Sequence, residues 1–544
     1  MSETKFRLAN TTAVEPLLNN WAIWSDLIAP APYSLHVRNY QIKTLTSYLN
    51  NPEIHLKACR NPKFTGGPFV DVPVERAGEI KALLESTQDS HQENIEFASS
   101  IVDFYDLLQQ EAKGQSLDPY YEKLPAPLRG YVELIYDYFN HPNLRFIESL
   151  LYHSPYYKKN LQSLRIFTQQ SDSSRPFFLS TPRLLNENEI DWNVPFESSL
   201  IDELYRTDME PQPLGRIREL LGLSAADDER LLPLLSSVPA RHAPRWDGEG
   251  IRIRYFNHAC VLVEGNGVSI LTDPWIGIES VAGGAERLSY EDLPEKIDYA
   301  LITHNHHDHF VLETLLRLRQ RIGCLVVPRA FGIYYADTSL KLMAQQLGFQ
   351  NVVELDALET IKLPDGEIIA VPFLGEHADL AHAKSGFVVR LGKEQILFAA
   401  DSNCLDRRIY EHLRRIIGPT ETVFLGMECV GAPLSWLYGA LLPHKLQHTH
   451  DKSRRTKGSN SDAATNLLEA VGAKRVYVYA MGREPWLQYG MGLGPADDSP
   501  QNRESKKLLE EVIAKGFEDA QRPYCMFETY PGAAVGEAAI ARVA

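Results

Sequence analysis

Several features that would place this chain in a membrane or outside the cell are missing from its sequence. Its 544 residues include no uninterrupted apolar run of about 18 residues, the length that a transmembrane helix needs. The N-terminal stretch Met1-Ser2-Glu3-Thr4-Lys5 lacks the apolar core of a secretory signal peptide. The 6 cysteines are scattered and follow neither a disulfide nor a zinc-ligand spacing. These absences favour a protein of the reducing cytoplasm.

Positive charge is also scarce. The chain has 55 Lys and Arg residues against 71 Asp and Glu residues, a formal net charge of −16. Affinity for phosphate backbones requires a basic surface, so this balance argues against a nucleic-acid partner. The sequence has no flavin or nicotinamide fingerprint and no iron–sulfur cysteine spacing. Any redox chemistry would therefore need electrons from another protein.

The length of the chain predicts two domains. The best boundary lies between Pro239 and Gly250, where two prolines and two glycines interrupt the pattern. We expect a mixed, mainly helical domain over residues 1–240, a linker over 241–250 and a second domain over 251–544. Amphipathic helical patterns in the first domain occur near 73–88, 93–113 and 127–139.

The pattern changes after the boundary. Strands are predicted at 251–255, 260–263 and 269–272, and Glu264-Gly265-Asn266-Gly267 is a hairpin signal between the last two. Further along, a helix over 463–471, capped by Ser461 or Asp462, ends at Gly472 and precedes a strand at 475–479. Hairpin strands followed by alternating helices and strands predict an α/β fold of the αββα sandwich type.

The most informative stretch is Thr303-His304-Asn305-His306-His307-Asp308-His309-Phe310. It follows a short buried strand and precedes apolar residues at helical spacing, so it forms a turn at the carboxyl end of a strand, where α/β folds place their sites. Such a turn can direct His304 and His306 to one metal ion, and Asp308 and His309 to a second. These ligands suit zinc, iron or manganese and do not choose among them.

The spacing His-x-His-x-Asp-His is the signature of the metallo-β-lactamase superfamily, whose αββα fold the second half of the chain resembles. That superfamily contains many hydrolases and also oxidoreductases, so the resemblance indicates the scaffold more firmly than the reaction.

Other acids and histidines at strand ends can complete the two metal sites. Asp401 ends the predicted strand 396–400, and we expect its carboxylate to bridge the two ions. Asp273 also follows a strand, and we expect it to orient a ligand histidine rather than to bind metal. For the last ligand, His444 is the best candidate, and spacing does not exclude His448 or His450.

Glu376 and His377 are adjacent at a strand end where hydrolases of the superfamily carry a third histidine. If His377 binds, the first metal has three imidazoles, which favours a dizinc hydrolase acting on a phosphodiester, lactone or amide. If Glu376 binds, the site gains an anionic oxygen ligand and becomes similar to the carboxylate-rich centres of diiron enzymes.

With this Glu-His pair, the late Pro443-His444 and the large first domain, nearly the whole chain resembles the diiron β-hydroxylases of nonribosomal peptide biosynthesis. The resemblance implies one iron held by His304, His306 and Glu376, a second held by Asp308, His309 and His444, and Asp401 as the bridge. It also implies a first domain that covers the metal cleft and contributes to a homodimer.

The same resemblance implies the reaction and its partners. An O2-dependent monooxygenase with two oxo- or hydroxo-bridged iron ions would hydroxylate the Cβ of an amino acid. That amino acid would be held as a thioester on a peptidyl carrier protein of a nonribosomal peptide synthetase. Electrons would come from an external donor, a reductase or a ferredoxin.

A basic loop in this acidic chain is a candidate contact for the carrier protein, which is usually acidic and whose arm bears a phosphate. Its cations are Lys445, Lys452, Arg454, Arg455 and Lys457. A solvated loop without a partner explains the same residues equally well.

Overall fold

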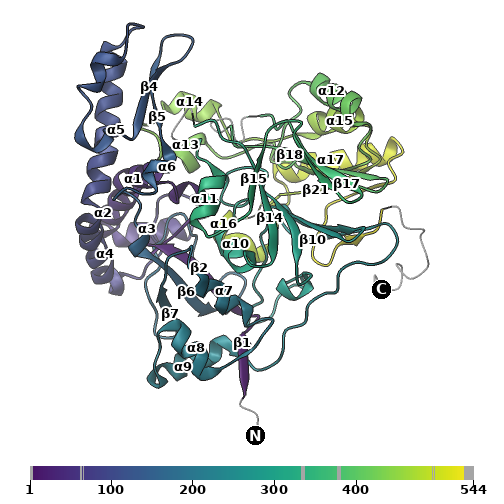
Figure 1. The fold of residues 1–544 in the computed structure, drawn as a ribbon, viewed down its shortest axis with the longest axis horizontal. Coiled ribbons are helices and arrows are strands. Elements are labelled where there is room, and N and C mark those ends of the chain that lie inside the picture. Colours follow the sequence, from purple (N-terminus) through teal and green to yellow (C-terminus); the bar gives the residue numbers. More distant parts are fainter. Residues whose placement is uncertain are drawn as a thin grey trace.

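The computed structural model describes residues 4–61, 64, 66–332, 337–375, 382–492, 494 and 496–531. Two seven-stranded sheets form the second half of the chain, and a smaller, largely helical assembly from the first half lies against one of them (Figure 1). The predicted α/β fold class, with an αββα sandwich after a mixed N-terminal region, is confirmed. No helix within the described ranges has both the length and the apolar character that crossing a bilayer requires.

The first half contains three small sheets. Strand β1 (Lys5–Leu8) lies between β8 (Gln212–Pro213) and β9 (Leu235–Ser236), and both pairings are antiparallel. A four-stranded sheet has the order β3 (Trp21–Ala22), β2 (Thr12–Leu18), β6 (Gln162–Thr168), β7 (Ile190–Asn193). The third sheet is the hairpin of β4 (Val132–Tyr136) and β5 (Pro142–Phe146).

Helices surround these sheets. The longest are α4 (Ala77–Ser90) and α5 (Gln92–Glu111), which lie where the sequence predicted helices. The others are shorter: α1 (Pro30–His36), α2 (Ile42–Asn50), α3 (Pro52–Cys59), α6 (Glu148–Leu151), α7 (Ser199–Arg206), α8 (Leu214–Leu221) and α9 (Asp228–Leu231).

The amphipathic pattern at 127–139 was wrong as a helix prediction, because this segment forms β4 and its turn. Val132 and Leu134 are buried and Glu133 between them is exposed, which is the two-residue alternation of a strand. Asn140 has a positive φ of 61°, and Asp137 accepts hydrogen bonds from the backbone of Phe139 and His141. This turn closes the hairpin and prevents a helix from continuing.

The first large sheet has the order β15 (Val352–Leu355), β14 (Ile322–Pro328), β13 (Ile297–Leu301), β12 (Val268–Thr272), β11 (Cys260–Gly265), β10 (Ile251–Asn257), β23 (Glu528–Thr529). The second has the order β16 (Thr360–Leu363), β17 (Gly366–Val371), β18 (Gly386–Leu391), β19 (Glu394–Phe398), β20 (Thr422–Gly426), β21 (Arg475–Tyr479), β22 (Asp519–Gln521).

Alternate residues of each strand enter different cores. Ile270 and Leu301 face the layer between the sheets, whereas their neighbours Leu271 and Ala300 face outward. Because both faces are buried, the strands are apolar at almost every position, as expected of a sandwich with covered outer faces. The outer face of the second sheet packs against α12 (Arg407–Ile417), α15 (Ser461–Val471) and α17 (Pro500–Ala514).

For helix α15, the sequence predicted the C-terminal end correctly but not the N-cap. It ends at Gly472, which adopts a left-handed φ of 80°, as the sequence indicated. Its N-cap is Asn460, whose side chain accepts a hydrogen bond from the Ala463 N–H, rather than Ser461 or Asp462. Shorter helices α13 (Leu434–Tyr438), α14 (His448–Ser453) and α16 (Gln488–Met491) lie in the connecting loops.

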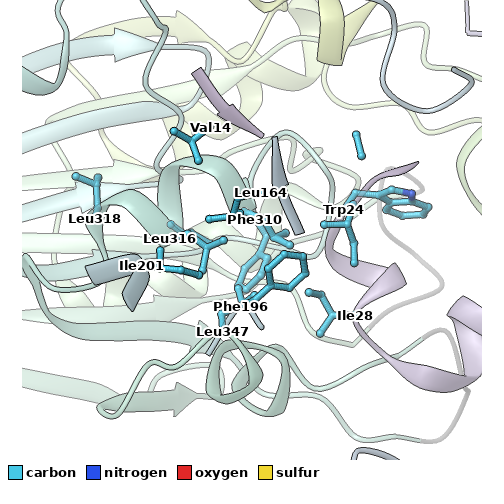
Figure 2. Packing of buried hydrophobic residues seen from close by; sticks show 14 of the residues in the cluster. Val14, Trp24, Ile28, Leu164, Phe196, Ile201, Phe310, Leu316, Leu318 and Leu347 are labelled. Atoms are coloured by element: carbon cyan, nitrogen blue, oxygen red, sulfur yellow. The ribbon is translucent and has the colours of Figure 1, made fainter. Parts of the chain in front are cut away.

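The outer face of the first sheet carries α10 (Leu312–Leu318) and α11 (Leu340–Gln346), and the first half of the chain packs against both. Figure 2 shows Phe310 and Leu316 beside residues of the first half. Trp24, Phe196 and Ile201 belong to the same buried cluster. The two halves therefore share one continuous apolar core.

A carboxylate is buried at this junction. Asp26 is 1% exposed, and its Oδ1 accepts hydrogen bonds from Asn305 Nδ2 at 2.7 Å and Thr338 Oγ1 at 3.3 Å. Burial raises the pKa of Asp26 from 3.8 to about 7, and the two hydrogen bonds oppose this only in part. The folded protein therefore binds a proton here that the unfolded chain has lost between these pH values.

We predict a pH-dependent contribution of Asp26 to stability. A raised folded-state pKa stabilises the protein fully below about pH 4, and this stabilisation is lost as the pH rises through about 7. At about 1.4 kcal/mol per pKa unit, its upper limit is on the order of 4 kcal/mol. The difference in free energy of unfolding between wild type and Asp26→Asn, measured in urea from pH 4.5 to 8, should fall as the pH rises. A pH-independent difference would contradict this assignment.

Candidate metal centre

His304, His306, Asp308, His309 and Asp401 lie at one end of the sandwich, where strands from both sheets end. The His304–His309 turn follows β13, Asp273 follows β12 and Asp401 follows β19. Glu428 follows β20 at the same end. The carboxyl ends of neighbouring parallel strands meet at one edge of a sheet, which is why residues far apart in sequence come together here.

The backbone around the site is strained. His258, Asp273, Ala400 and Ala480 all have positive φ angles, of 47°, 34°, 46° and 51°. Residues other than glycine rarely adopt this conformation, which has an energetic cost. Each of the four lies within two residues of a strand end or in the β10–β11 turn, so the strain is concentrated at the strand ends that carry the candidate ligands.

The ligand atoms converge closely. His304 Nε2 lies 3.1 Å from His306 Nδ1 and 3.9 Å from Asp401 Oδ2. His309 Nε2 lies 2.9 Å from Asp401 Oδ2 and 3.9 Å from Asp308 Oδ2. All five side chains are buried. The sequence-predicted turn and the predicted bridging residue are thus brought together.

Two overlapping triads have the geometry of metal sites. His304, His309 and Asp401 form one, and His258, Asp308 and His309 form the other, with the offered ligand atoms within 4.8 Å of one another in each. Ligand atoms about 2.1 Å from a shared ion lie roughly 3.0–3.4 Å apart, close to several of the separations here.

Unsatisfied polar atoms support the same interpretation. Among the described residues, Asp308 Oδ1 and His258 Nδ1 are buried without a hydrogen-bond partner. His309 Nε2 and His258 Nε2 each lie close only to a carboxylate oxygen, of Asp401 and Asp308. Buried polar atoms normally have partners, so two unpaired atoms beside these close contacts indicate a missing ligand. A pair of cations would satisfy them, and the donor set of imidazole and carboxylate suits transition metals.

The charges of the site also indicate that it binds cations. Burial raises the pKa of Glu428 well above its ordinary value, and the nearby carboxylates of Asp401 and Asp308 raise it further. Burial would also raise the pKa of Asp308, but the imidazoles of His307 and His309 more than offset this and lower it. Three carboxylates crowded in a buried site require cations to be stable in their charged forms.

Asp273 holds one of the predicted ligands in place. Its Oδ2 accepts a hydrogen bond from His309 Nδ1 at 2.8 Å and another from Thr303 Oγ1 at 2.7 Å. Burial alone would lower the pKa of His309, but Asp273 and Asp308 raise it well above its ordinary value. Because Nδ1 donates to Asp273, Nε2 is the nitrogen that faces Asp401, which is the arrangement expected for a carboxylate that orients a metal ligand.

His444 differs from expectation. Its imidazole is about half exposed, and Nε2 lies 2.6 Å from Asp106 Oδ1 in the first half of the chain. The loop that carries it passes over the first half instead of turning inward, and the structure does not bring His444 to the cluster. The alternatives His448 and His450 belong to α14 in the same loop, where His450 is exposed.

The basic loop is only partly available to a partner. Lys445 and Lys452 are exposed. Arg455 turns inward, where its Nε donates to the Gly431 carbonyl at 2.7 Å and its charge lowers the pKa of Glu428 against the effect of burial. Arg454 is partly buried.

Glu376 and His377 lie outside the described residues, so the choice between them stays a prediction. The described residues on either side contact the site. The Asn403 N–H donates to the Leu374 carbonyl at 2.8 Å, two residues from Asp401. After the gap, the Ser385 N–H donates to the Thr303 carbonyl at 2.7 Å.

Sequence reasoning missed three residues of the site. His258 Nε2 lies 3.1 Å from Asp308 Oδ2, Tyr438 OH lies 2.8 Å from His306 Nε2, and Glu428 faces Asp401 and Asp308. Glu428 alone had a signal, because it follows the apolar segment of β20 much as Asp401 follows β19. In the structure, Gly426 lets β20 approach the bridging candidate closely, because an added Cβ would lie 2.4 Å from Asp401 Oδ1.

Two family models match separate parts of the chain. A "diiron non-heme beta-hydroxylase N-terminal domain" matches residues 7–239, and a "beta-lactamase superfamily domain" matches 269–479. A metal-dependent hydrolase of Pyrobaculum islandicum is 29% identical over 28% of this chain and 62% of its own length, so that likeness is limited to part of the chain.

Other similarities extend over nearly the whole chain. The 4-amino-L-phenylalanyl-[CmlP-peptidyl-carrier-protein] 3-hydroxylase of Streptomyces venezuelae is 36% identical over 94% of this chain and 97% of its own length. The crystal structure of CmlA, a diiron beta-hydroxylase from Streptomyces venezuelae, superposes with a TM-score of 0.90 at 35% identity, covering 97% of this chain and all of that one. This chain therefore belongs to the diiron non-haem β-hydroxylase family.

Proposed function

We propose that this protein is an O2-dependent diiron monooxygenase that hydroxylates the Cβ of an amino acid held as a thioester on a peptidyl carrier protein. The observation that carries the proposal is similarity over nearly the full length to a hydroxylase whose name gives a carrier-bound substrate. The hydrolase match covers only about a quarter of the chain, so it does not account for the first half.

The ligand set that we propose contains three histidines and four carboxylates. His304, His306 and Glu376 would hold one iron, and Asp401 would bridge to the second. Asp308 and His309 would hold the second iron. When bound, the irons would supply the activation of O2 with electrons from an external reductase or ferredoxin.

For the last ligand we propose Glu428 in place of His444. Glu428 is partly buried, and the charges of Asp401, Asp308 and His309 all affect its pKa. His444 is about half exposed and would have to leave Asp106 to bind metal. An anionic ligand here also agrees with the carboxylate-rich centre that Glu376 would give.

The surrounding residues would serve the centre by orientation and by exclusion of water. Asp273 fixes the tautomer and ring position of His309, and Tyr438 contacts His306. The first half of the chain would cover this end of the sandwich, and its shared core with the second half and the burial of the metal turn support that role. A tethered substrate would then have to reach the centre from the outside on its flexible arm, with Lys445 and Lys452 as candidate contacts for an acidic carrier.

The ligand assignment is tested with two matched pairs of variants. Glu376→Ala and Glu428→Ala should each lose about one of two irons per chain, because each removes a ligand, and should abolish hydroxylation. His377→Ala and His444→Ala should keep both irons. Iron and zinc are measured by elemental analysis of each purified variant. If Glu376→Ala instead kept both metals and His377→Ala lost one, with two zinc ions in active enzyme, the chain would belong with the dizinc hydrolases.

Loss of the hydrogen bond to His309 should weaken metal binding. Asp273→Ala is expected to lower metal affinity about 10–100-fold, the usual effect of removing the partner that orients a ligand imidazole. Affinity is measured by competition with a chelator. Asp298→Ala, at a carboxylate that contacts Ser269 on the same sheet, is the control and should leave affinity unchanged. Equal affinities in the two variants would show that Asp273 does not orient a ligand.

The form of the substrate is tested by mass spectrometry. With reductant and O2, the loaded carrier protein should gain one oxygen, whereas the free amino acid should not react at a comparable rate. The reason is that tethering positions one Cβ–H bond near the irons, which a free amino acid must achieve by binding alone. Comparable gain of oxygen on the free amino acid would contradict the tethering requirement.

A further inference from the structure

A closed set of three hydrogen bonds joins the metal turn to the first half of the chain. Asn305 Nδ2 donates to Asp26 Oδ1 at 2.7 Å and lies 3.0 Å from Thr338 Oγ1. Thr338 Oγ1 in turn donates to Asp26 Oδ1 at 3.3 Å. All three side chains are at least 96% buried. Hydrogen bonds in a buried environment of low dielectric constant are electrostatically stronger than those at a surface, so this contact holds its partners firmly.

The position of Asn305 gives the contact its importance. It lies between His304 and His306 in sequence, and the His304 Nε2 and His306 Nδ1 atoms are 3.1 Å apart. A residue in the middle of such a tight turn cannot move without changing the relative positions of the two imidazoles. The side chain of Asn305 contacts the first half of the chain, so that half acts on the turn directly.

The third residue extends the contact to the other side of the centre. Thr338 follows Asp337, whose Oδ1 accepts hydrogen bonds from the backbone N–H groups of His382 at 2.8 Å and Ala383 at 3.0 Å. Ser385, two residues later, donates to the Thr303 carbonyl, immediately before the metal turn. The same set of contacts therefore connects the first half, the metal turn and the segment that leads away from the Glu376 region.

We propose that Asp26 is a positioning residue, through which the first half of the chain sets the geometry of the His304–His306 pair by way of Asn305. The proposal rests on the proposed function only in naming iron as the metal. Among the described residues, Asp26 has hydrogen bonds to Asn305 and Thr338 and to none of the proposed ligands. Its effect is exerted through Asn305, and it gives the first half of the chain a direct role at the centre in addition to covering it.

A purely structural role for Asp26 makes different predictions. Other polar contacts also join the two halves, such as Arg319 with Asp202 at 2.9 Å and Arg317 with Asp208 at 3.1 Å. Neither of these pairs includes a residue of the metal turn. If Asp26 serves only to hold the halves together, its loss should resemble the loss of Asp202 and should leave the metal turn unaffected.

The test compares Asp26→Leu, Asp26→Asn and Asp202→Leu in the full-length protein. Asp26→Leu removes the acceptor for Asn305, whereas Asp26→Asn keeps an amide oxygen that can accept the same hydrogen bond. Three measurements are made: amide hydrogen exchange over residues 303–310, the rate of metal loss to a chelator, and the near-ultraviolet absorption of the metal centre. kcat and KM on the carrier-bound substrate are measured in parallel.

We expect exchange over 303–310 and metal loss to be about tenfold faster in Asp26→Leu, with an altered absorption band and a lower kcat at nearly unchanged KM. Asp26→Asn should restore all four properties to within about twofold of wild type, because the hydrogen bond to Asn305 remains. Asp202→Leu should match wild type over 303–310 even if its thermal stability falls.

Wild-type exchange, metal loss and absorption in Asp26→Leu would overturn the proposal, as would equal effects in Asp202→Leu. If Asp26→Leu fails to fold, Asn305→Ala removes the same contact from the other side and is judged by the same measurements. Failure of the proposed function is distinguishable, since exchange and metal loss report on the turn whichever metal binds and whether or not hydroxylation occurs.

Discussion

Burial of the outer face of the first large sheet is the constraint on which the rest of the structure depends. That face is apolar over β11 to β14, and α10 and α11 cover it together with the first half of the chain. Phe310, directly after the metal turn, packs into this same core beside Trp24 and Phe196 (Figure 2). At about 25 cal/mol per Å² of apolar surface removed from water, such a junction contributes much of the stability of both halves. The metal turn therefore lies between the first large sheet and the first half of the chain, and packing on both sides fixes its position.

The acidic residues of the metal centre have the opposite effect on stability from this apolar packing. Asp308, Asp401 and Glu428 are forced together by the fold, and burial makes their charged forms costly. Cations remove this cost, so binding of metal and completion of the fold are expected to support each other. The backbone at four positions around the site is also strained, and packing elsewhere must offset the energetic cost of that strain. These positions are His258, Asp273, Ala400 and Ala480.

The sequence predicted those parts of the molecule that have a short-range cause. The His-x-His-x-Asp-His turn, Asp401 and Asp273 all follow strands with clear apolar patterns, and the structure gathers them at one end of the sandwich. The pattern at 127–139 was misleading because Leu128 and Val132, four residues apart, fit helical spacing, whereas Val132 and Leu134 fit strand alternation. There, the turn at Asn140 decides the outcome.

Contacts between distant segments could not be predicted in the same way. His444 was chosen for its place late in the chain, but the course of its loop depends on a contact with Asp106, 338 residues earlier. His258 gave no signal, since a single histidine in a hairpin turn resembles any other. Glu428 has the same position relative to a strand as Asp401, and only the spatial crowding of the carboxylates distinguishes it from an ordinary strand-end acid.

The pairing of β1 has a consequence for the order in which the protein can fold during synthesis. This strand, at Lys5–Leu8, is made long before its partners, which both lie beyond residue 210. Likewise β10, which opens the second half, pairs on one side with β23 at residues 528–529. In each half, the first strand therefore cannot be fully paired until the last segments of that half have left the ribosome. Contacts of such long sequence separation slow folding and leave strand edges exposed meanwhile. Newly made chains of this protein should consequently depend on chaperones more than their compact final structure suggests.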